Sequence, residues 1–329
     1  MLRVAIAGAG MVSLYHLRAW STVAGARVVA IADPDCARAE ARALEFGVGA
    51  TFADAQQMLD KVRPDALDIA AGHAAHRMLC LAAADRGIPV LCQKPLAPTL
   101  VEARAIIADV GTRVRLMIHE NWRFRPWYKQ ARDWLDDGAI GVPEELELAT
   151  RSSGFLLREG KRPALERQPM LARIPRLMIG EVLVHHLDVA CSMLGPMQVV
   201  AASTHHGSEG VLGETTAAIT LRGPATSARV SGNFTDPDAS PFPTDAMRLV
   251  GSVGTIVLAG NVLQLDGHQK AQARFDLIVG YQDSYDAAIT HFANALVHSQ
   301  PFATSPGVHL QVLTMAEEAY RLADHATSA

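Results

Sequence analysis

A lysine at the end of an apolar, strand-like segment is the first residue suited to proton transfer. Lys94 follows the strand-like residues 88–92 and precedes Pro95. A lysine that is partly desolvated, or close to another cation, can lose its proton near neutral pH. Such an amine can accept the proton of an alcohol while hydride leaves the adjoining carbon, which is general-base chemistry. We therefore expect Lys94 to be catalytic, against the alternative of an ordinary surface lysine.

A second acid–base group lies in the helix-like residues 180–194. Glu181, His185 and Asp188 are spaced i, i+4 and i+7, so a regular α-helix places them on one face. His186 then points about 100° away. The pattern predicts that His185 hydrogen-bonds a substrate hydroxyl and shares the base role. Glu181 would orient His185 or tune its charge, and Asp188 would be structural; the alternative is a surface helix carrying a Glu/His pair.

The first strand-like segment runs into the motif Gly-x-Gly-x-x-Ser, which is typical of a phosphate-binding turn. Gly8 permits a tight turn and Gly10 lets the backbone approach a pyrophosphate. The helix that starts at Met11 and Val12 then offers free N–H groups and the positive end of its dipole. Ser13 replaces the third glycine of the motif and is still small. The motif predicts binding of a dinucleotide.

Asp33 indicates which dinucleotide this is. It ends the next strand-like segment, 27–32, where a carboxylate can accept hydrogen bonds from both ribose hydroxyls. The same carboxylate would repel a 2′-phosphate, so NAD is favoured over NADP, although the nearby Arg38 keeps NADP possible. The alternative is that the glycines only form a turn and that Asp33 only caps the following helix.

Several further residues have two interpretations. His76 follows a strand where the nicotinamide should lie, or it simply begins a helix. Asn121 and Arg123 contact cofactor or substrate, or neither. Residues 151–176 carry seven basic and two acidic residues, which suits a lid over an anionic substrate but also a solvated loop or subunit contact. A zinc site would need three or four converging ligands, and no spacing pairs the Glu/His helix with His73 and His76, so no metal is expected.

The order of elements predicts an α/β fold with two domains. Strand-like and helix-like segments alternate up to residue 120, which indicates a doubly wound parallel sheet with right-handed crossovers. From residue 121 the pattern changes to one of helices and of short β-like runs bounded by Gly, Pro and Asn. We expect a Rossmann domain at 1–120 and an α+β domain with a large, mostly antiparallel sheet at 121–329. The C-terminal helix is expected to pack back on the first domain.

Composition narrows the class of protein. The 329 residues include 30 Lys and Arg against 34 Asp and Glu, and 49% are apolar, so two packed cores are expected. The slightly acidic balance argues against nucleic-acid binding. Residues 189–208 have no charge but include Pro196 and two histidines, so no membrane span is expected. Four cysteines without a Cys-x-x-Cys pair suggest a reducing compartment, and we expect a cytoplasmic protein.

Several motifs together resemble the glucose–fructose oxidoreductase/inositol dehydrogenase/rhizopine-catabolism (GFO/IDH/MocA) family. Gln93-Lys94-Pro95 is similar to its Glu-Lys-Pro signature, and residues 71–76, from Ala71 to His76, are similar to its Thr-Pro-x-x-x-His. Residues 120–126 resemble its crossover into the second domain. Residues 180–188 resemble its Gly-x-x-x-x-His-x-x-Asp helix, and residues 251–258 its late hairpin. Three positions depart from the pattern: Gln93 for Glu, Gly72 for Pro, and Glu181 for Asp.

The resemblance implies hydride transfer between nicotinamide and a hydroxyl or carbonyl carbon of a sugar, cyclitol, sugar acid or related polyol. It implies a catalytic group of Lys94, His185 and Glu181, and a cis Lys94–Pro95 bond. Cofactor contacts are expected from Gly8, Gly10, Met11, Val12, Asp33, Ala71, His76 and Lys94, and substrate contacts from Lys94, Asn121, Arg123 and His185. It also implies a homodimer or homotetramer.

Two alternatives to a simple dehydrogenase remain. A tightly held NAD can be reduced and reoxidised within one turnover, which gives elimination, glycoside cleavage or epimerisation. A non-catalytic nucleotide-binding regulator would need neither Lys94 nor His185, so their presence argues against it.

Overall fold

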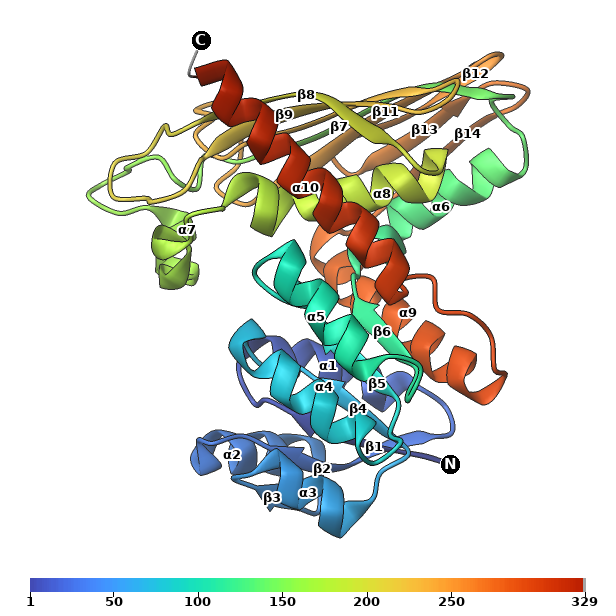
Figure 1. Ribbon diagram of the computed structural model, residues 1–329. Coiled ribbons are helices and arrows are strands. Elements are labelled where there is room, and N and C mark those ends of the chain that lie inside the picture. The colour runs from blue at the N-terminus through green and yellow to red at the C-terminus, as the bar shows by residue number, and fades with distance from the viewer. Residues whose placement is uncertain (328–329) are drawn as a thin grey trace. The chain divides into compact units, whose positions relative to one another are not determined.

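The computed structural model describes residues 1–327 and divides the chain into two compact units (Figure 1). The first unit comprises Met1–Arg125 and Ile278–Gln311, and the second comprises Pro126–Leu277 and the chain from Val312. The expected division at residue 120 differs from this in two respects, since the first boundary follows Arg125 and residues 278–311 belong to the first unit. Their assignment has a physical basis, because Ile289 and Phe292 are buried in the core of that unit.

The first unit is built on a parallel six-stranded sheet in the order β3-β2-β1-β4-β5-β6. All its strand pairs are parallel, so the predicted doubly wound sheet is confirmed. The order reverses between β1 and β4, and ligands of such sheets bind at the carboxyl ends of the strands next to this point. The strands are β1 (Leu2–Ala7), β2 (Ala26–Ala32), β3 (Thr51–Phe52), β4 (Ala66–Ile69), β5 (Val90–Gln93) and β6 (Leu116–His119).

Helices cover both faces of this sheet (Figure 1). Helices α1, α2 and α9 share one core with alternate strand residues such as Ile6, Ile31 and Leu91. Helices α3, α4 and α5 pack beside one another on the other face. Their bounds are α1 (Met11–Thr22), α2 (Cys36–Phe46), α3 (Ala55–Val62), α4 (His76–Ala84), α5 (Leu100–Val110) and α9 (Leu277–Val297), and short 3-10 turns lie at His73–Ala75 and Trp122–Phe124.

Side-chain caps fix the starts of three of these helices. Asp35 accepts the Arg38 N–H at the start of α2, and Thr99 accepts the Glu102 N–H at the start of α5. Asp54 caps α3 in the same way. Such caps satisfy N–H groups that have no partner inside the helix, and each contributes about 1 kcal/mol. Helix α1 has no such side chain at its start, which leaves its first N–H groups available.

The second unit contains an eight-stranded sheet in the order β14-β13-β12-β11-β7-β10-β9-β8. Its pairs are antiparallel except β7–β10, which is parallel and places β7 in the middle of the sheet. The predicted mostly antiparallel sheet is therefore confirmed. The strands are β7 (Pro143–Arg151), β8 (Gln198–His205), β9 (Thr216–Arg222), β10 (Ser227–Asn233), β11 (Thr244–Gly251), β12 (Gly254–Ala259), β13 (Val262–Asp266) and β14 (Lys270–Arg274).

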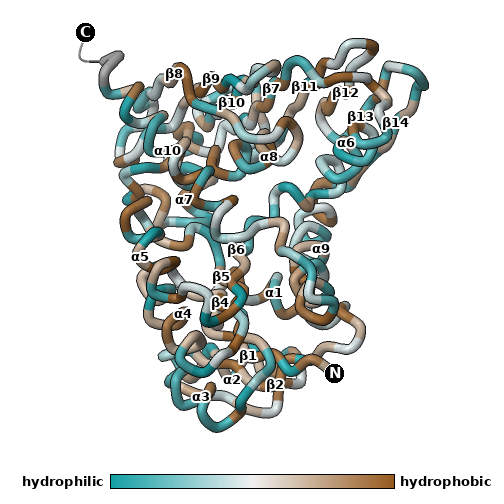
Figure 2. Tube along the Cα trace, turned by 45° about the vertical axis from the view of Figure 1, so that its right-hand side comes forward, coloured by the Kyte–Doolittle hydropathy of each residue, from teal (hydrophilic) through white to brown (hydrophobic). Residues whose placement is uncertain are grey.

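Within the described residues, helices of the second unit pack on one face of this sheet. Along β10 and β11 buried residues alternate with more exposed ones, as a half-covered sheet requires. Hydrophilic and hydrophobic segments both occur along the strands of this sheet (Figure 2). Helices α6 and α8 and the π-helical turn before α8 pack on the buried face. The elements are α6 (Pro126–Asp136), α7 (Pro163–Arg167), a 3-10 turn (Pro169–Arg173), the π-helical turn (Met178–Leu183), α8 (Val184–Leu194) and α10 (Pro306–Thr327), of which α10 begins in the first unit.

Two features of the fold differ from the sequence expectation. The short pair β3 and α3 was not predicted, because two residues of strand and eight of helix give little periodicity. The expected regular helix over 180–194 instead begins with the π turn at Met178–Leu183. No helix within the described residues is long and apolar enough to cross a membrane.

Candidate active site

The turn after β1 is fixed by contact between two main chains. Gly8 has a φ of +108°, which side-chain-bearing residues rarely adopt. A Cβ added there would lie 2.6 Å from the carbonyl oxygen of Ala70, just beyond β4. The Gly8 N–H donates to the carbonyl of Ala32 at 2.7 Å. The glycine is therefore required by the close approach of the strand ends on either side of it.

Gly10 has the opposite surroundings, because an added Cβ would meet nothing within 4 Å. It is the cap residue of α1, and no side chain bonds to the N–H groups of that helix start. Met11 is exposed and Val12 partly buried, while the Ser13 hydroxyl is buried and donates to the Gly10 carbonyl at 2.7 Å. Open space in front of free helix N–H groups is what a pyrophosphate needs.

Asp33 lies against this loop from the end of β2. One carboxylate oxygen accepts the Ala9 N–H at 2.7 Å, and the other accepts the Asp35 N–H at 2.9 Å. The side chain is only partly buried, and a carboxylate has about four acceptor positions, so it can also receive two hydroxyls. Arg38 pairs with Asp35 at 2.9 Å, and both side chains are largely exposed. The loop, Gly10 and Asp33 together fit an adenosine ribose and pyrophosphate.

His76 bridges two loops at the carboxyl edge of the first sheet. Its Nε2 lies 3.0 Å from the carbonyl oxygen of Ala71, and its Nδ1 lies 3.1 and 3.2 Å from those of Pro95 and Leu96. Burial lowers the pKa of His76, and the three carbonyls oppose that shift. The ring is 1% exposed. This geometry positions the Lys94–Pro95 loop beside Ala71, and the predicted cofactor contacts of Ala71 and His76 stay predictions.

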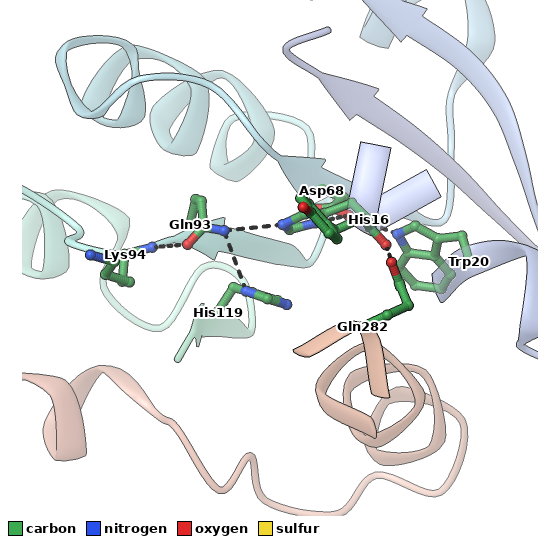
Figure 3. Close-up of polar contacts among 8 residues, drawn as sticks. His16, Trp20, Asp68, Gln93, Lys94, His119 and Gln282 are labelled. Atoms are coloured by element: carbon green, nitrogen blue, oxygen red, sulfur yellow. Dashed lines mark hydrogen bonds and ion pairs between the residues drawn. The ribbon is translucent and has the colours of Figure 1, made fainter. Parts of the chain in front are cut away.

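Lys94 follows β5 at the carboxyl edge of the sheet and is partly buried. Its N–H donates to the side-chain oxygen of Gln93 at 2.7 Å. The Lys94–Pro95 bond is cis, as the resemblance implied. Figure 3 shows Lys94 beside Gln93 at the end of a set of buried polar side chains. The main chain of Lys94, at the end of β5, is thus held by a hydrogen bond to the Gln93 side chain.

A buried acid of the first unit, Glu120, interacts electrostatically with this lysine. Gln93 pairs with His119 in the sheet register, so Lys94 and Glu120 are the next residues on neighbouring parallel strands. Burial raises the pKa of Glu120, which is 3% exposed, while the Trp122 N–H, Lys94, His309 and Arg123 act to lower it. A buried carboxyl next to the amine therefore contributes to its electrostatic surroundings. Glu120 was not predicted as a site residue, although an acid directly after a strand end was visible in the sequence.

The two predicted substrate contacts that follow Glu120 make bonds within the first unit. The buried Asn121 amide donates to the Ser284 hydroxyl at 2.7 Å. One Arg123 nitrogen donates to the carbonyl of Ala303 at 3.1 Å. These bonds fix the segment after β6, and the contact of either residue with substrate or cofactor stays a prediction.

Glu181 and His185 are carried by the π turn and by α8 of the second unit. Glu181 lies within the π turn, is partly buried and has its N–H bonded to the carbonyl of Leu177 at 3.1 Å. His185 is 4% exposed and Asp188 2% exposed on α8. A π turn has i→i+5 bonds and hence more residues per turn than an α-helix. The prediction that Glu181, His185 and Asp188 lie on one helix face assumed a regular α-helix through Glu181, so it is corrected for that residue. His185 and Asp188 do lie together on the regular helix α8.

A buried carboxylate from another loop holds the start of the π turn. Glu214 accepts the N–H groups of Leu177 at 3.2 Å and Ile179 at 3.0 Å. It also accepts the Tyr320 hydroxyl at 2.6 Å, and that hydroxyl accepts the Gly180 N–H at 3.0 Å. Four polar groups at the start of the turn are thereby paired, and Glu181 is carried on the held segment.

His186 has a structural partner in its own unit. Its Nε2 lies 3.1 Å from Asp245 on β11, and the same carboxylate accepts the Tyr128 hydroxyl at 3.0 Å. Basic residues of segment 151–176 contact neighbouring loops and helix α10 of the same unit. Arg162 donates to the Ser208 hydroxyl and Arg167 to the Pro241 carbonyl, while Arg176 pairs with Glu317 at 2.7 Å. These contacts hold loops together, and the predicted lid stays untested.

Comparison with known proteins places the chain in a family. Residues 2–117 match the GFO/IDH/MocA model, described as an oxidoreductase family with an NAD-binding Rossmann fold. The chain is 34% identical to a D-apiose dehydrogenase of Paraburkholderia graminis over 82% of its length and 70% of the relative's. A D-apiose dehydrogenase of Rhizobium rhizogenes is 30% identical over 98% and 95%. The chain belongs to the GFO/IDH/MocA oxidoreductase family.

A solved member of similar sequence extends the likeness over the whole chain. An oxidoreductase from Agrobacterium radiobacter, crystallised with NAD+, L-tartaric acid and magnesium, has a TM-score of 0.91 and 28% identity. The match covers 99% of this chain and 97% of that one. As a GFO/IDH/MocA member the chain is an NAD-binding dehydrogenase, and its glycine loop and Asp33 are the residues that fit the cofactor.

Proposed function

We propose that this dehydrogenase transfers hydride between NAD and a hydroxyl or carbonyl carbon of a sugar, cyclitol or related small polyol, with Lys94 and His185 as its acid–base group. The main support is the placement of Lys94, which leaves β5 at the carboxyl edge of the sheet, where open α/β sheets bind ligands. The cofactor loop lies at the same edge, after β1.

In the oxidative direction the reaction separates one hydrogen of the substrate as hydride and another as a proton. Bound NAD supplies the hydride acceptor. Lys94 takes the hydroxyl proton as the C–O bond becomes a carbonyl, and His185 hydrogen-bonds the same oxygen and shares the proton. Glu181 orients His185 or tunes its charge. In the reductive direction the lysine or the histidine returns the proton to the alkoxide oxygen.

The substrate class rests on the relatives. Both D-apiose dehydrogenases are named for a sugar, and the Agrobacterium structure holds L-tartaric acid, a compound with two hydroxyl-bearing carbons. The family resemblance adds cyclitols. We propose that the substrate is a small compound with neighbouring hydroxyls. We also propose that the protein is a homodimer or homotetramer, and analytical ultracentrifugation would measure its mass.

The test is an NADH-production assay with D-apiose, myo-inositol, L-tartrate and further sugars and sugar acids. Accumulating NADH supports net oxidation, whereas conversion without NADH indicates an internal redox cycle. Lys94→Ala should lower turnover by about 10²–10⁴-fold, as expected for a general base. The affinity for NAD should stay within about threefold, a change of well under 1 kcal/mol. Unchanged turnover in this variant would remove Lys94 from the mechanism.

The shared role of the two residues has its own test. If Lys94 and His185 act on one proton, Lys94→Ala/His185→Ala should lose little more turnover than the worse single variant, because groups acting as a unit are non-additive. Multiplicative losses would show that they act independently.

A further inference from the structure

A line of buried polar side chains leads to the main chain of Lys94 (Figure 3). It starts at Asp68 on β4, continues through His16 on α1, and reaches Gln93 at the end of β5. Asp68 and His16 are fully buried and Gln93 is 8% exposed. Buried polar groups in a core are normally hydrogen-bonded. In this line the donor and the acceptor of each contact can be assigned.

The Asp68 carboxylate determines which nitrogen of His16 carries a proton. It accepts the Trp20 indole N–H at 2.7 Å and lies 2.8 Å from His16 Nδ1. A carboxylate only accepts hydrogen bonds, so Nδ1 is the protonated nitrogen. In the neutral ring, His16 Nε2 is then an acceptor, and it faces the side-chain nitrogen of Gln93 at 3.2 Å.

The amide of Gln93 matches this arrangement at every contact. Its nitrogen donates to His16 Nε2 and lies 3.5 Å from His119 Nδ1, and its oxygen accepts the Lys94 N–H at 2.7 Å. An amide has two donors and an acceptor, and this site presents partners for all three. His16 and His119 also pack against the Tyr285 ring, with centroid distances of 5.5 and 4.9 Å.

We propose that Gln93 is a positioning residue for hydride transfer: Asp68 and His16 orient its amide, and the amide oxygen holds the main chain from which the Lys94 amine extends. This inference rests on the proposed role of Lys94. A displacement of about 1 Å at a reacting group can cost about 10²-fold in rate, so a fixed main chain at Lys94 bears on turnover rather than on cofactor affinity.

The amide also explains how the departure from Glu-Lys-Pro is accommodated. A glutamate at position 93 would still accept the Lys94 N–H, but it has no hydrogen to donate to His16. The contact with His16 Nε2 would be satisfied only if the ring took a second proton and lay between two carboxylates. The amide at position 93 therefore fits a His16 ring that carries one proton, whereas a glutamate there would fit a ring that carries two.

The first experiment separates turnover from cofactor binding in Gln93→Met, which keeps the length of the side chain without its polar atoms. With NAD and the most active compound of the panel above, kcat should fall about 10- to 10²-fold. The Kd of NAD, from NADH fluorescence displacement, should stay within about twofold. Ile118→Val is the matched control: it trims the buried strand beside Cys92 without touching these polar contacts and should keep its kcat.

The second experiment reads the His16 ring directly and needs no activity. In ¹⁵N-histidine-labelled protein, the His16 signals, assigned by their loss in His16→Gln, should show a protonated Nδ1 and an unprotonated Nε2. In Gln93→Glu both nitrogens should be protonated, and kcat should recover to well above that of Gln93→Met, because the carboxylate again holds the Lys94 N–H.

Two results would overturn the inference: a wild-type kcat in Gln93→Met, or a protonated Nε2 of His16 in the unchanged protein. Loss of turnover in Lys94→Ala together with normal turnover in Gln93→Met would refute only the role of Gln93. Normal turnover in Lys94→Ala would refute the proposed function, while the ¹⁵N result would still report on the amide and His16.

Discussion

The nucleotide loop of the first unit and the π turn of the second unit are both helix starts, but they are held in different ways. The loop depends on main-chain contact, since Gly8 lies against Ala70 and α1 begins without a side-chain cap. The π turn depends on Glu214 and Tyr320, which are far away in the sequence. A helix start that requires glycine at a fixed position leaves a sequence motif, whereas one held by distant side chains leaves none.

The largest effect is expected for Gly8→Ala, which tests whether main-chain contact holds the nucleotide loop. The added Cβ would lie 2.6 Å from the Ala70 carbonyl at a φ of +108°, so the strand ends must separate. We expect a loss of about 3 kcal/mol in the free energy of unfolding, measured in urea, and no measurable NAD binding.

Gly10→Ala is the matched control for this variant. Its Cβ meets no protein atom within 4 Å, so the free energy of unfolding should change by less than about 0.5 kcal/mol. Its NAD affinity should nevertheless fall, because the new methyl group would occupy the space in which we propose that the pyrophosphate binds. Equal destabilisation by the two variants would contradict the distinction between them.

The second unit is tested by Glu214→Gln. The amide cannot accept from Leu177, Ile179 and Tyr320 together, and hydrogen bonds to a charged group are worth about 1.5–3 kcal/mol. We expect a loss of about 2 kcal/mol in the free energy of unfolding. The exposed Glu209→Gln should change it by less than about 0.5 kcal/mol, and an equally small effect at Glu214 would show that the π turn is held by other contacts.

A smaller effect is expected at Asp33, the residue proposed to bind the ribose. Asp33→Ala should raise the Kd of NAD about tenfold, or about 1.4 kcal/mol, and that of NADP less. Asp54→Ala removes the cap of α3 and leaves the Asp35–Arg38 ion pair in place, so it should leave the preference for NAD intact. Parallel changes for both cofactors in Asp33→Ala would refute the assignment of Asp33 to the ribose.

The smallest effect concerns the buried Glu120. Burial raises its pKa above the ordinary value of 4.5, so the folded state binds its proton more tightly than the unfolded chain does. Its contribution to stability is therefore full below about pH 4.5 and is lost as the pH rises through the folded pKa. Urea unfolding of wild type and Glu120→Gln across this range should show wild type losing stability relative to the variant, and parallel curves would contradict it.

Much of the first unit was predictable because its signals are local. The apolar run Val4-Ala5-Ile6-Ala7, the turn at Gly8 and the helix after Gly10 follow one another directly, and the structure matches them. Helix α3 was missed because it is only eight residues long. The π turn was missed because its carboxylate partner comes from position 214, which no periodicity within residues 180–194 could reveal.

The buried line to Gln93 was also beyond sequence reasoning, although one signal was present. Asp68 is an acid inside the otherwise apolar strand β4, and a buried acid requires a partner. The partner, His16, lies on helix α1, 52 positions earlier, so only the folded chain shows the pair. Gln93 could be seen as a departure from a signature, but its meaning depends on the ring next to it.

The π turn also makes the second unit adjustable by length as well as by side-chain type. Because an i→i+5 turn holds one residue more than an i→i+4 turn, removing a single residue such as Val182 would restore a regular helix. The side chain at 181 would then swing by about 100° around the helix axis relative to His185. A one-residue deletion here would therefore redirect an acidic side chain while every other residue of the turn keeps its identity.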